Sequence, residues 1–335
     1  MKPIYTILYI VTALLLCCPC SVFASQPAKW WNLEDIHIRD PYILPVEATR
    51  TYYLYRTSDS IAADGSVRGG VEVFTSKDLK RWYGPQLVFR VPADNWITGA
   101  VWAPEVHHYR GKYYLFATLN SPITWKKERQ GWPAYTFRGT QIFYADRPEG
   151  PFKAFSPMPH TPMDWMALDG TLYEENGVPY MVFCHEWVQL TDGTMDVVPL
   201  KADLSAPAAP PMRLFCASDA PWSTGKQDAA DLPTYYVTDG CFLYRSRTGR
   251  LLMIWSSYCN GQYAVGVAQS ATGRIAGPWV QQSKPLFSRN GGHGMLFSSF
   301  DGKLYIVLHG PNEPSGAERA HLFEIEDLGN TLILK

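Results

Sequence analysis

Apolar residues gather in short runs along the chain, and no long stretch has the spacing of a helix. Five similar segments are rich in aromatic and β-branched residues. They are "TYYLYRTS" from Thr51, "KYYLFATLN" from Lys112, "VPYMVFCHEW" from Val178, "RLLMIWSSYC" from Arg250 and "KLYIVLHG" from Lys303. The starts lie 53 to 72 residues apart. Such runs are typical of strands, and a glycine-containing turn precedes each of the last four, so each predicts the second strand of a β-hairpin.

Further strands flank these hairpins. The strand ahead of each turn reads "DPYIL", "APEVHHY", "DGTLYEE", "DGCFLYR" and "GGHGMLFSSF", and a third strand follows four of the hairpins. A fourth strand is predicted in "PQLVFR", "MRLFCAS" and "KPLFSR". Five such units predict an all-β fold, a five-bladed β-propeller that forms one domain over residues 25–335. A β-sandwich has similar short strands, but the period is too long for single hairpins and suits propeller blades.

Composition and charge limit the classes of partner that the protein can bind. The 335 residues are 46% apolar and 14% aromatic, enough for a large core. Charges nearly cancel, 30 basic against 31 acidic, and no basic run stands out. This argues against nucleic acid or an anionic membrane as the partner and favours a neutral ligand, bound by a monomer.

The first 24 residues read as a secretory signal. Lys2 precedes an apolar run, and "VFA" ends at Ala24, where cleavage would release an exported chain, secreted or periplasmic. No later run is long enough to span a membrane. A lipid anchor at Cys17, Cys18 or Cys20 is the alternative, which the bulky Leu16 disfavours.

Four cysteines remain after the signal, and their spacing is not that of a zinc site. They are Cys184, Cys216, Cys241 and Cys259. In an oxidising compartment an even number permits one or two disulfides. Buried free thiols are the other interpretation.

Ionisable residues stand at the heads of all five predicted inner strands. They are Asp40, Glu105, Asp169, Asp239 and His293. In a propeller these heads converge at one end of the central axis, where carboxylates placed close together have shifted pKa values. The repeat therefore predicts a polar pocket there.

With these motifs in this order, from "RDPYI" to "GGHGMLFSSFDGKLYIVLH", the chain from Ile36 to Ile325 resembles glycoside hydrolase family 43. The resemblance implies hydrolysis of arabinofuranosides, xylosides or galactans with inversion, for which no cofactor is required. It implies that Asp40 is the general base and Asp169 the residue that tunes the acid. The acid of the family is usually Glu in "EGP", but this chain has "DGC" with Asp239, so Glu186 in "HEW" is the alternative acid and Glu105 the next.

Other residues are expected to shape the pocket. Arg39, Trp102, Glu105, Trp165 and His293 are predicted to bind substrate. The resemblance also implies a calcium ion in the axial channel beside His293, held through water, whereas a His bonded to backbone in a Gly-rich turn is the simpler interpretation. Residues 119–141 are predicted to form a loop over the pocket that decides between exo and endo action.

Two competing functions remain open. One is a glycan-binding propeller that has lost catalysis, with Asp239 in place of Glu as the lesion. The other is a related propeller glycosidase, such as a fructosidase, which Arg39 in place of the expected Asn disfavours.

Overall fold

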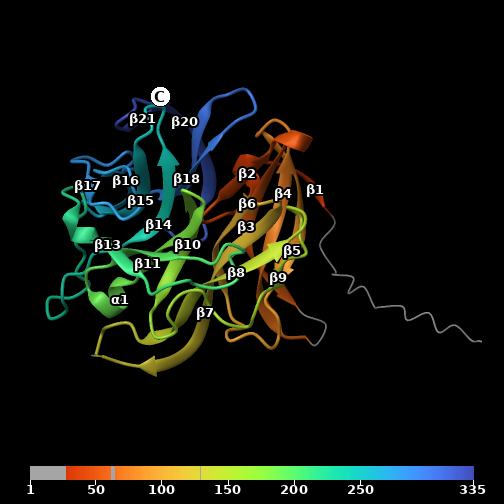
Figure 1. Ribbon diagram of the computed structural model, residues 1–335. Helices are drawn as coiled ribbons and strands as arrows, with labels where there is room; N and C mark the ends of the chain where they lie inside the picture. The colour runs from red at the N-terminus through yellow and green to blue at the C-terminus, as the bar shows by residue number, and fades with distance from the viewer. Residues whose placement is uncertain (1–27, 62–64, 129) are drawn as a thin grey trace, which may run out of the picture.

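A computed structural model describes residues 28–61, 65–128 and 130–335, and the predicted signal peptide lies outside them. The described chain forms five antiparallel sheets. The first strand of each sheet contacts the first strand of the next, and the fifth returns to the first, so the sheets close a ring. Figure 1 places these inner strands, β2, β6, β10, β14 and β18, near the middle of the molecule. The predicted five-bladed all-β propeller is confirmed.

The strands of each blade follow chain order from the axis outwards, with one exception in blade one. Blade one contains β2 (Tyr42–Val46), β3 (Thr51–Ile61), β4 (Val67–Ser76), β5 (Arg81–Arg90) and, outermost, β1 (Lys29–Asn32). Blade two contains β6 (Val101–Tyr109), β7 (Lys112–Lys126), β8 (Tyr135–Ala145) and β9 (Lys153–Ala154). Blade three contains β10 (Ala167–Glu175), β11 (Val178–His185), β12 (Thr194–Pro199) and β13 (Met212–Cys216). Blade four contains β14 (Asp239–Arg245), β15 (Leu251–Cys259), β16 (Gln262–Ser270) and β17 (Trp279–Gln281), and blade five contains β18 (Gly292–Ser298), β19 (Leu304–Gly310), β20 (Arg319–Asp327) and β21 (Leu332–Leu334).

One predicted strand is wrong. The outer strand of blade four is β17, not "KPLFSR", because the chain turns back directly after β16 and pairs Trp279 with Ser270. Trp279 is buried against the core of blades three and four. Residues 284–289 contribute only an isolated bridge between Phe287 and Val265, with the Phe287 ring buried between blades four and five.

Helical structure is limited to single turns in the described residues. They are η1 (Leu33–Asp35), η2 (Glu47–Thr49), α1 (Trp187–Leu190) and η3 (Ala217–Asp219). Within the described ranges no helix is long and apolar enough to cross a membrane.

The core consists of side chains packed between neighbouring blades. Between blades three and four, for example, Val182 and Met195 pack with Met253 and Trp255. The described cysteines all carry free thiols, and Cys184 and Cys241 are buried in this same layer. The four thiols are therefore free in this structure, but only two of them are buried, since Cys216 and Cys259 are partly exposed.

A β-bulge at the head of the inner strands sets the geometry of the axis. The pairing shifts register at this point in four of the five blades. The first residue of the bulge has a left-handed backbone in these four blades, with φ of 42° at Ala103, 57° at Asp169, 41° at Gly240 and 48° at His293, and in blade one Asp40, just before β2, has φ of 51°. Left-handed conformations are costly for residues other than glycine and cluster at functional sites, so the fold maintains a strained ring of backbone here.

The bulge corrects the predicted equivalence of the five heads. Asp40, Asp169 and His293 do occupy the same position in their blades. Asp239 lies one residue earlier than this position, since its blade places Gly240 there, and Glu105 lies two residues later than Ala103. The sequence prediction aligned the five strands by the ends of their apolar runs. A β-bulge adds one residue without interrupting such a run, so this alignment can be wrong by one or two positions.

Candidate functional site

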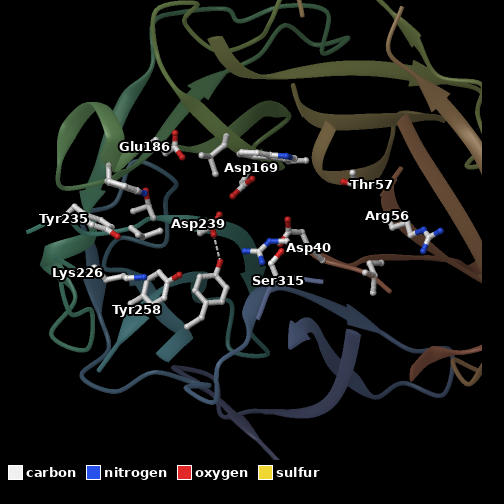
Figure 2. Close-up of a pocket in the computed structure, with 18 of the residues that line it drawn as sticks. Asp40, Arg56, Thr57, Asp169, Glu186, Lys226, Tyr235, Asp239, Tyr258 and Ser315 are labelled. Carbon is white, nitrogen blue, oxygen red and sulfur yellow. Dashed lines mark hydrogen bonds and ion pairs between the residues drawn. The ribbon is translucent and has the colours of Figure 1, made fainter. Parts of the chain in front are cut away.

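A cavity of about 580 Å³ opens at the end of the ring where the inner strands begin. Figure 2 shows Asp40, Asp169 and Asp239 close to its centre, with Glu186 at one side. All four carboxylates line the cavity. Aromatic rings form much of the remaining wall, contributed by Trp102, Trp187, Tyr235, Tyr258 and Tyr263.

His293 brings the three aspartates together. Its Nδ1 atom lies 3.2 Å from Oδ1 of Asp40, 3.8 Å from Oδ2 of Asp169 and 3.8 Å from Oδ1 of Asp239. Carboxylates from blades one, three and four therefore meet around one imidazole supplied by blade five. His293 does not line the cavity itself but lies beside these carboxylates.

Asp40 is surrounded by positively charged or potentially charged groups. The backbone N–H of Asp40 donates to Nδ1 of His309 at 3.2 Å. The same Nδ1 atom of His309 lies 3.1 Å from Oδ1 of Asp40. Burial by itself would raise the pKa of Asp40, but His293, His309 and Arg39 together hold that pKa well below its usual range. Asp40 is therefore ionised at neutral pH, as a general base must be.

A hydrogen-bonded chain fixes this arrangement from behind. Arg39 donates to Oε1 of Glu318 at 3.3 Å and to Oδ1 of Asn312 at 2.8 Å. The same Asn312 oxygen lies 3.2 Å from Nε2 of His309. Sequence reasoning did not identify these three partners of Arg39 and Asp40. His309 could have been found, because a hairpin places the end of its second strand beside the head of the first, where Gly292 pairs with His309.

Asp169 and Asp239 behave as a pair. The N–H of Gly240 donates to Oδ2 of Asp169 at 3.0 Å, and the hydroxyl of Tyr263 donates to Oδ2 of Asp239 at 2.5 Å. Burial first, and then the neighbouring Asp239, raise the pKa of Asp169 well above its usual value. Two carboxyl groups this close hold one proton between them more readily than two negative charges.

The raised pKa of Asp169 predicts a stabilising substitution. The unfolded chain loses this proton near the usual carboxyl pKa, whereas the folded protein retains it, so Asp169 lowers the stability of the fold as the pH rises above about 4. We expect Asp169→Asn to raise the free energy of unfolding at pH 7 by on the order of 1 kcal/mol while activity falls. Urea unfolding at pH 7 and at pH 3.5 measures this, and the gain should vanish at the lower pH. A variant that is less stable at both pH values would contradict the assignment.

Glu186 enters the cavity just before the short helix α1. Arg138 from β8 donates to its Oε2. Burial raises the pKa of Glu186, and the ion pair with Arg138 acts in the opposite direction. The guanidinium of Arg138 also lies over the ring of Trp102, 4.4 Å from its centroid.

The residues predicted to bind substrate fall into two groups. Arg39 and Trp102 line the cavity, and Trp102 is 40% exposed. Glu105 and Trp165 are not among the residues that line it. Glu105 instead accepts a hydrogen bond at Oε2 from Nε2 of His107 at 2.8 Å, and Trp165 stacks on His185 with 4.1 Å between ring centroids.

The axial cluster also has the donor types of a cation site. Asp169, Asp239 and His293 can each offer one ligand atom, and these atoms lie within 4.8 Å of one another. Carboxylate oxygens suit calcium, whereas an imidazole nitrogen suits it poorly as a direct ligand. The donors fit a hydrated cation that His293 contacts through water.

Residues 119–126 and 135–141 belong to an extended hairpin of β7 and β8 rather than to an irregular loop. The hairpin leaves blade two, and its Trp132 donates from Nε1 to the carbonyl of Val188 at 2.8 Å. The Trp132 ring packs edge-on against Trp187 and Tyr235, which stack on each other at 3.8 Å and line the cavity. The hairpin thus supports one wall of the cavity from outside.

This contact predicts a change in product pattern when Trp132 is replaced. We expect Trp132→Ala to loosen the stacked pair and to shift the lengths of the sugars released from a polymer, because the supported wall borders the cavity. Trp125→Ala is the matched control, since Trp125 lies on the same hairpin and does not line the cavity. Chromatography of the products measures both variants. Equal patterns for Trp132→Ala, for a deletion of residues 126–131 and for the wild type would exclude a role of the hairpin in product length.

Comparisons with known proteins show which family the chain resembles. The sequence profile described as "Glycosyl hydrolases family 43" matches residues 35–324. The crystal structure of an endo-arabinase from Bacteroides thetaiotaomicron is 36% identical, covers 88% of this chain and 96% of its own, and superimposes with a TM-score of 0.75. An α-L-arabinofuranosidase from Lactobacillus brevis is 19% identical, with coverage of 90% and 96% and a TM-score of 0.65, a likeness of fold.

A curated relative adds a weaker match in sequence. "Alpha-L-arabinofuranosidase 43" from Humicola insolens is 23% identical over 225 residues, 63% of this chain. The match spans only 43% of that relative's length. Taken with the profile, which covers most of the chain, and with the structure that is 36% identical, these matches show that the chain belongs to family 43 of the glycosyl hydrolases.

Proposed function

We propose that this protein hydrolyses α-L-arabinofuranosidic linkages of a plant-type arabinan with inversion at the anomeric carbon. The observation that carries the proposal is the meeting of Asp40, Asp169 and Asp239 in one cavity around His293. The sugar is taken from the names of the relatives, an endo-arabinase and an α-L-arabinofuranosidase. β-D-Xylosides and galactans are the next substrates to test.

In the proposed reaction Asp40 removes a proton from water as that water attacks the anomeric carbon. The depressed pKa of Asp40 keeps this base ionised over the working pH range. On the opposite face of the sugar, Asp239 gives a proton to the leaving oxygen. Asp169 supports this step because its raised pKa lets the pair hold a proton at neutral pH.

The spacing of the carboxylates bears on the stereochemistry. Oδ1 of Asp40 and Oδ1 of Asp239 lie 3.2 Å and 3.8 Å from the same nitrogen of His293. These two oxygens are therefore at most about 7 Å apart, a bound that includes the lower end of the 6.5–9.5 Å range of inverting glycosidases and also the separation of about 5 Å in retaining ones. Inversion is therefore proposed from the family, and the anomer of the product tests it.

The remaining parts of the proposal concern binding and location. Arg39 and Trp102 contribute polar and stacking contacts to the sugar, and a calcium ion beside His293 would add positive charge near the carboxylates. We further propose that the protein is exported after cleavage at Ala24 and acts as a monomer without a cofactor.

The experiment that tests the function measures turnover and product anomer together. Aryl α-L-arabinofuranosides, β-D-xylosides and β-D-galactosides are supplied with linear arabinan, and NMR follows the first anomer released. Hydrolysis of arabinan with inversion supports the proposal, and retention contradicts the mechanism. Binding of arabinan without release of any sugar would instead favour the alternative, a glycan-binding propeller that has lost catalysis.

A further inference from the structure

Arg138 and Glu186 form a second charged group in the cavity, apart from the axial aspartates. Figure 2 shows Asp40 on one side of Asp169 and Asp239 and Glu186 on the other. In a single displacement the base lies on the side of the attacking water, and the leaving group departs past the acid. A side chain beyond Asp239, as seen from Asp40, is therefore placed beside the leaving part of the substrate.

The contacts of Arg138 hold this group rigid before any substrate binds. Arg138 donates from Nε to Oδ1 of Asn120 and from its NH1 nitrogen to Oε2 of Glu186. Its guanidinium lies over one face of Trp102, 4.4 Å from the ring centroid. A guanidinium fixed at three points loses little freedom on binding, which is how a site gains affinity without new contacts.

Glu186 retains capacity to bind a ligand. Its Oε2 receives the bond from Arg138, while Oε1 has no hydrogen bond to any of the residues that the structure describes. The side chain is only 13% exposed but lines the cavity. A carboxyl oxygen with no hydrogen bond inside the described protein can accept one from a hydroxyl group, and the partly exposed Trp102 offers a flat apolar surface beside it.

We propose that Arg138 and Glu186, with Trp102, form the subsite for the leaving-group sugar, where Glu186 accepts hydrogen bonds from sugar hydroxyls and determines which oligosaccharides are cleaved. The inference rests on the proposed function, because it presumes a glycoside substrate. It assigns Glu186 to binding and leaves proton donation to Asp239. The geometry supports this division, since Arg138 occupies Oε2 of Glu186, whereas Asp239 lies in the axial cluster with Asp40.

The test uses Glu186→Gln in the full-length protein, which keeps the shape of the side chain and removes its charge. Kinetics are measured with linear arabino-oligosaccharides and with a series of aryl arabinofuranosides whose phenols differ in pKa. Dissociation constants for the oligosaccharides are measured by calorimetry in an Asp40→Asn background, with and without Glu186→Gln. Glu324→Gln is the control, because Glu324 lies on β20 of blade five, makes ion pairs with Lys303 and Lys335 and does not line the cavity.

We expect the KM and Kd for oligosaccharides to rise about tenfold or more in Glu186→Gln, as for loss of a hydrogen bond to a charged group, with kcat changed by less than about twofold. Aryl substrates, which lack leaving-group hydroxyls, should react as in the wild type for every phenol. Two results overturn the proposal. One is an unchanged Kd, including the case in which no tested oligosaccharide binds. The other is a loss of kcat that grows with the pKa of the phenol, which would identify Glu186 as the proton donor.

The test of Glu186 can fail or succeed independently of the test of the proposed function. If the wild type prefers xylo- or galacto-oligosaccharides, the arabinan assignment fails while the effect of Glu186→Gln is read on the preferred sugar. If the wild type cleaves nothing, the change in Kd still decides whether Glu186 binds the glycan.

Discussion

Asp40→Asn should lower kcat about 1,000-fold or more on every substrate that the wild type hydrolyses. The amide cannot accept the proton of the attacking water, and general base catalysis contributes about 10²- to 10⁴-fold on its own. KM should change little, because Asp40 acts on the water rather than on a sugar hydroxyl. Initial rates on arabinan and on an aryl arabinofuranoside measure the effect.

A control and a stability measurement accompany this variant. Asp146→Asn removes an exposed carboxylate that pairs with Lys112 and should retain full activity. The folded-state pKa of Asp40 is depressed, so its charge stabilises the fold above the usual carboxyl pKa, and this stabilisation is lost as the pH falls through the depressed value. Asp40→Asn should therefore melt lower than the wild type at pH 7. If Asp40→Asn kept activity within tenfold of the wild type, Asp40 would not be the general base.

Asp239→Ala should lower kcat in proportion to the basicity of the leaving group. A leaving oxygen of high pKa needs a proton as its bond breaks, whereas a nitrophenolate departs without one, so loss of the acid affects the first far more. We expect a decrease of about 100- to 10,000-fold on arabinan and a much smaller decrease on dinitrophenyl arabinofuranoside.

The pH profile supplies a second measurement for Asp239. Removal of the acid should flatten the alkaline limb of kcat against pH, while the acid limb set by Asp40 remains. The matched control is Tyr263→Phe, which removes the hydroxyl that donates to Asp239 and should shift the alkaline limb without abolishing it. An equal loss on all leaving groups would mean that Asp239 orients the substrate and that proton donation belongs elsewhere.

Much of the fold followed from periodic features of the sequence. The five similar segments that begin with "TYYLYRTS" form β3, β7, β11, β15 and β19. The strand predicted ahead of each of them is the inner strand of its blade. These predictions succeeded because strand content and turn residues are local properties. The one strand that was wrong is an outer strand, "KPLFSR" in place of β17. The position of this short edge strand depends on the buried Trp279 ring packing against the core of blades three and four, which is not a local property.

The candidate site was predicted only in part. Asp40, Asp169 and Asp239 line the cavity, and Arg39, Trp102 and Glu186 join them. Glu105 and Trp165 appeared equally suitable in sequence, yet the bulge turns Glu105 toward His107, and Trp165 lies against His185. Arg138, Asn312 and Glu318 were not identified, because each reaches the site from a strand or turn distant in sequence, whereas His309 was missed although its pairing with Gly292 could have indicated it.

The sequence by itself determined the number of blades, the order of their strands and the carboxylates available at the inner end. Repeated patterns of apolar residues and turns carry this information, since each unit satisfies its backbone bonds within its own sheet. The tertiary structure decided the electrostatics. Only the closed ring brings His293 against three aspartates, and only the hairpin from blade two brings Arg138 to Glu186. The pKa values of the aspartates, and the oxygen of Glu186 that remains free to accept a hydrogen bond, depend on distances between blades. Local patterns of apolar and turn residues do not encode these distances.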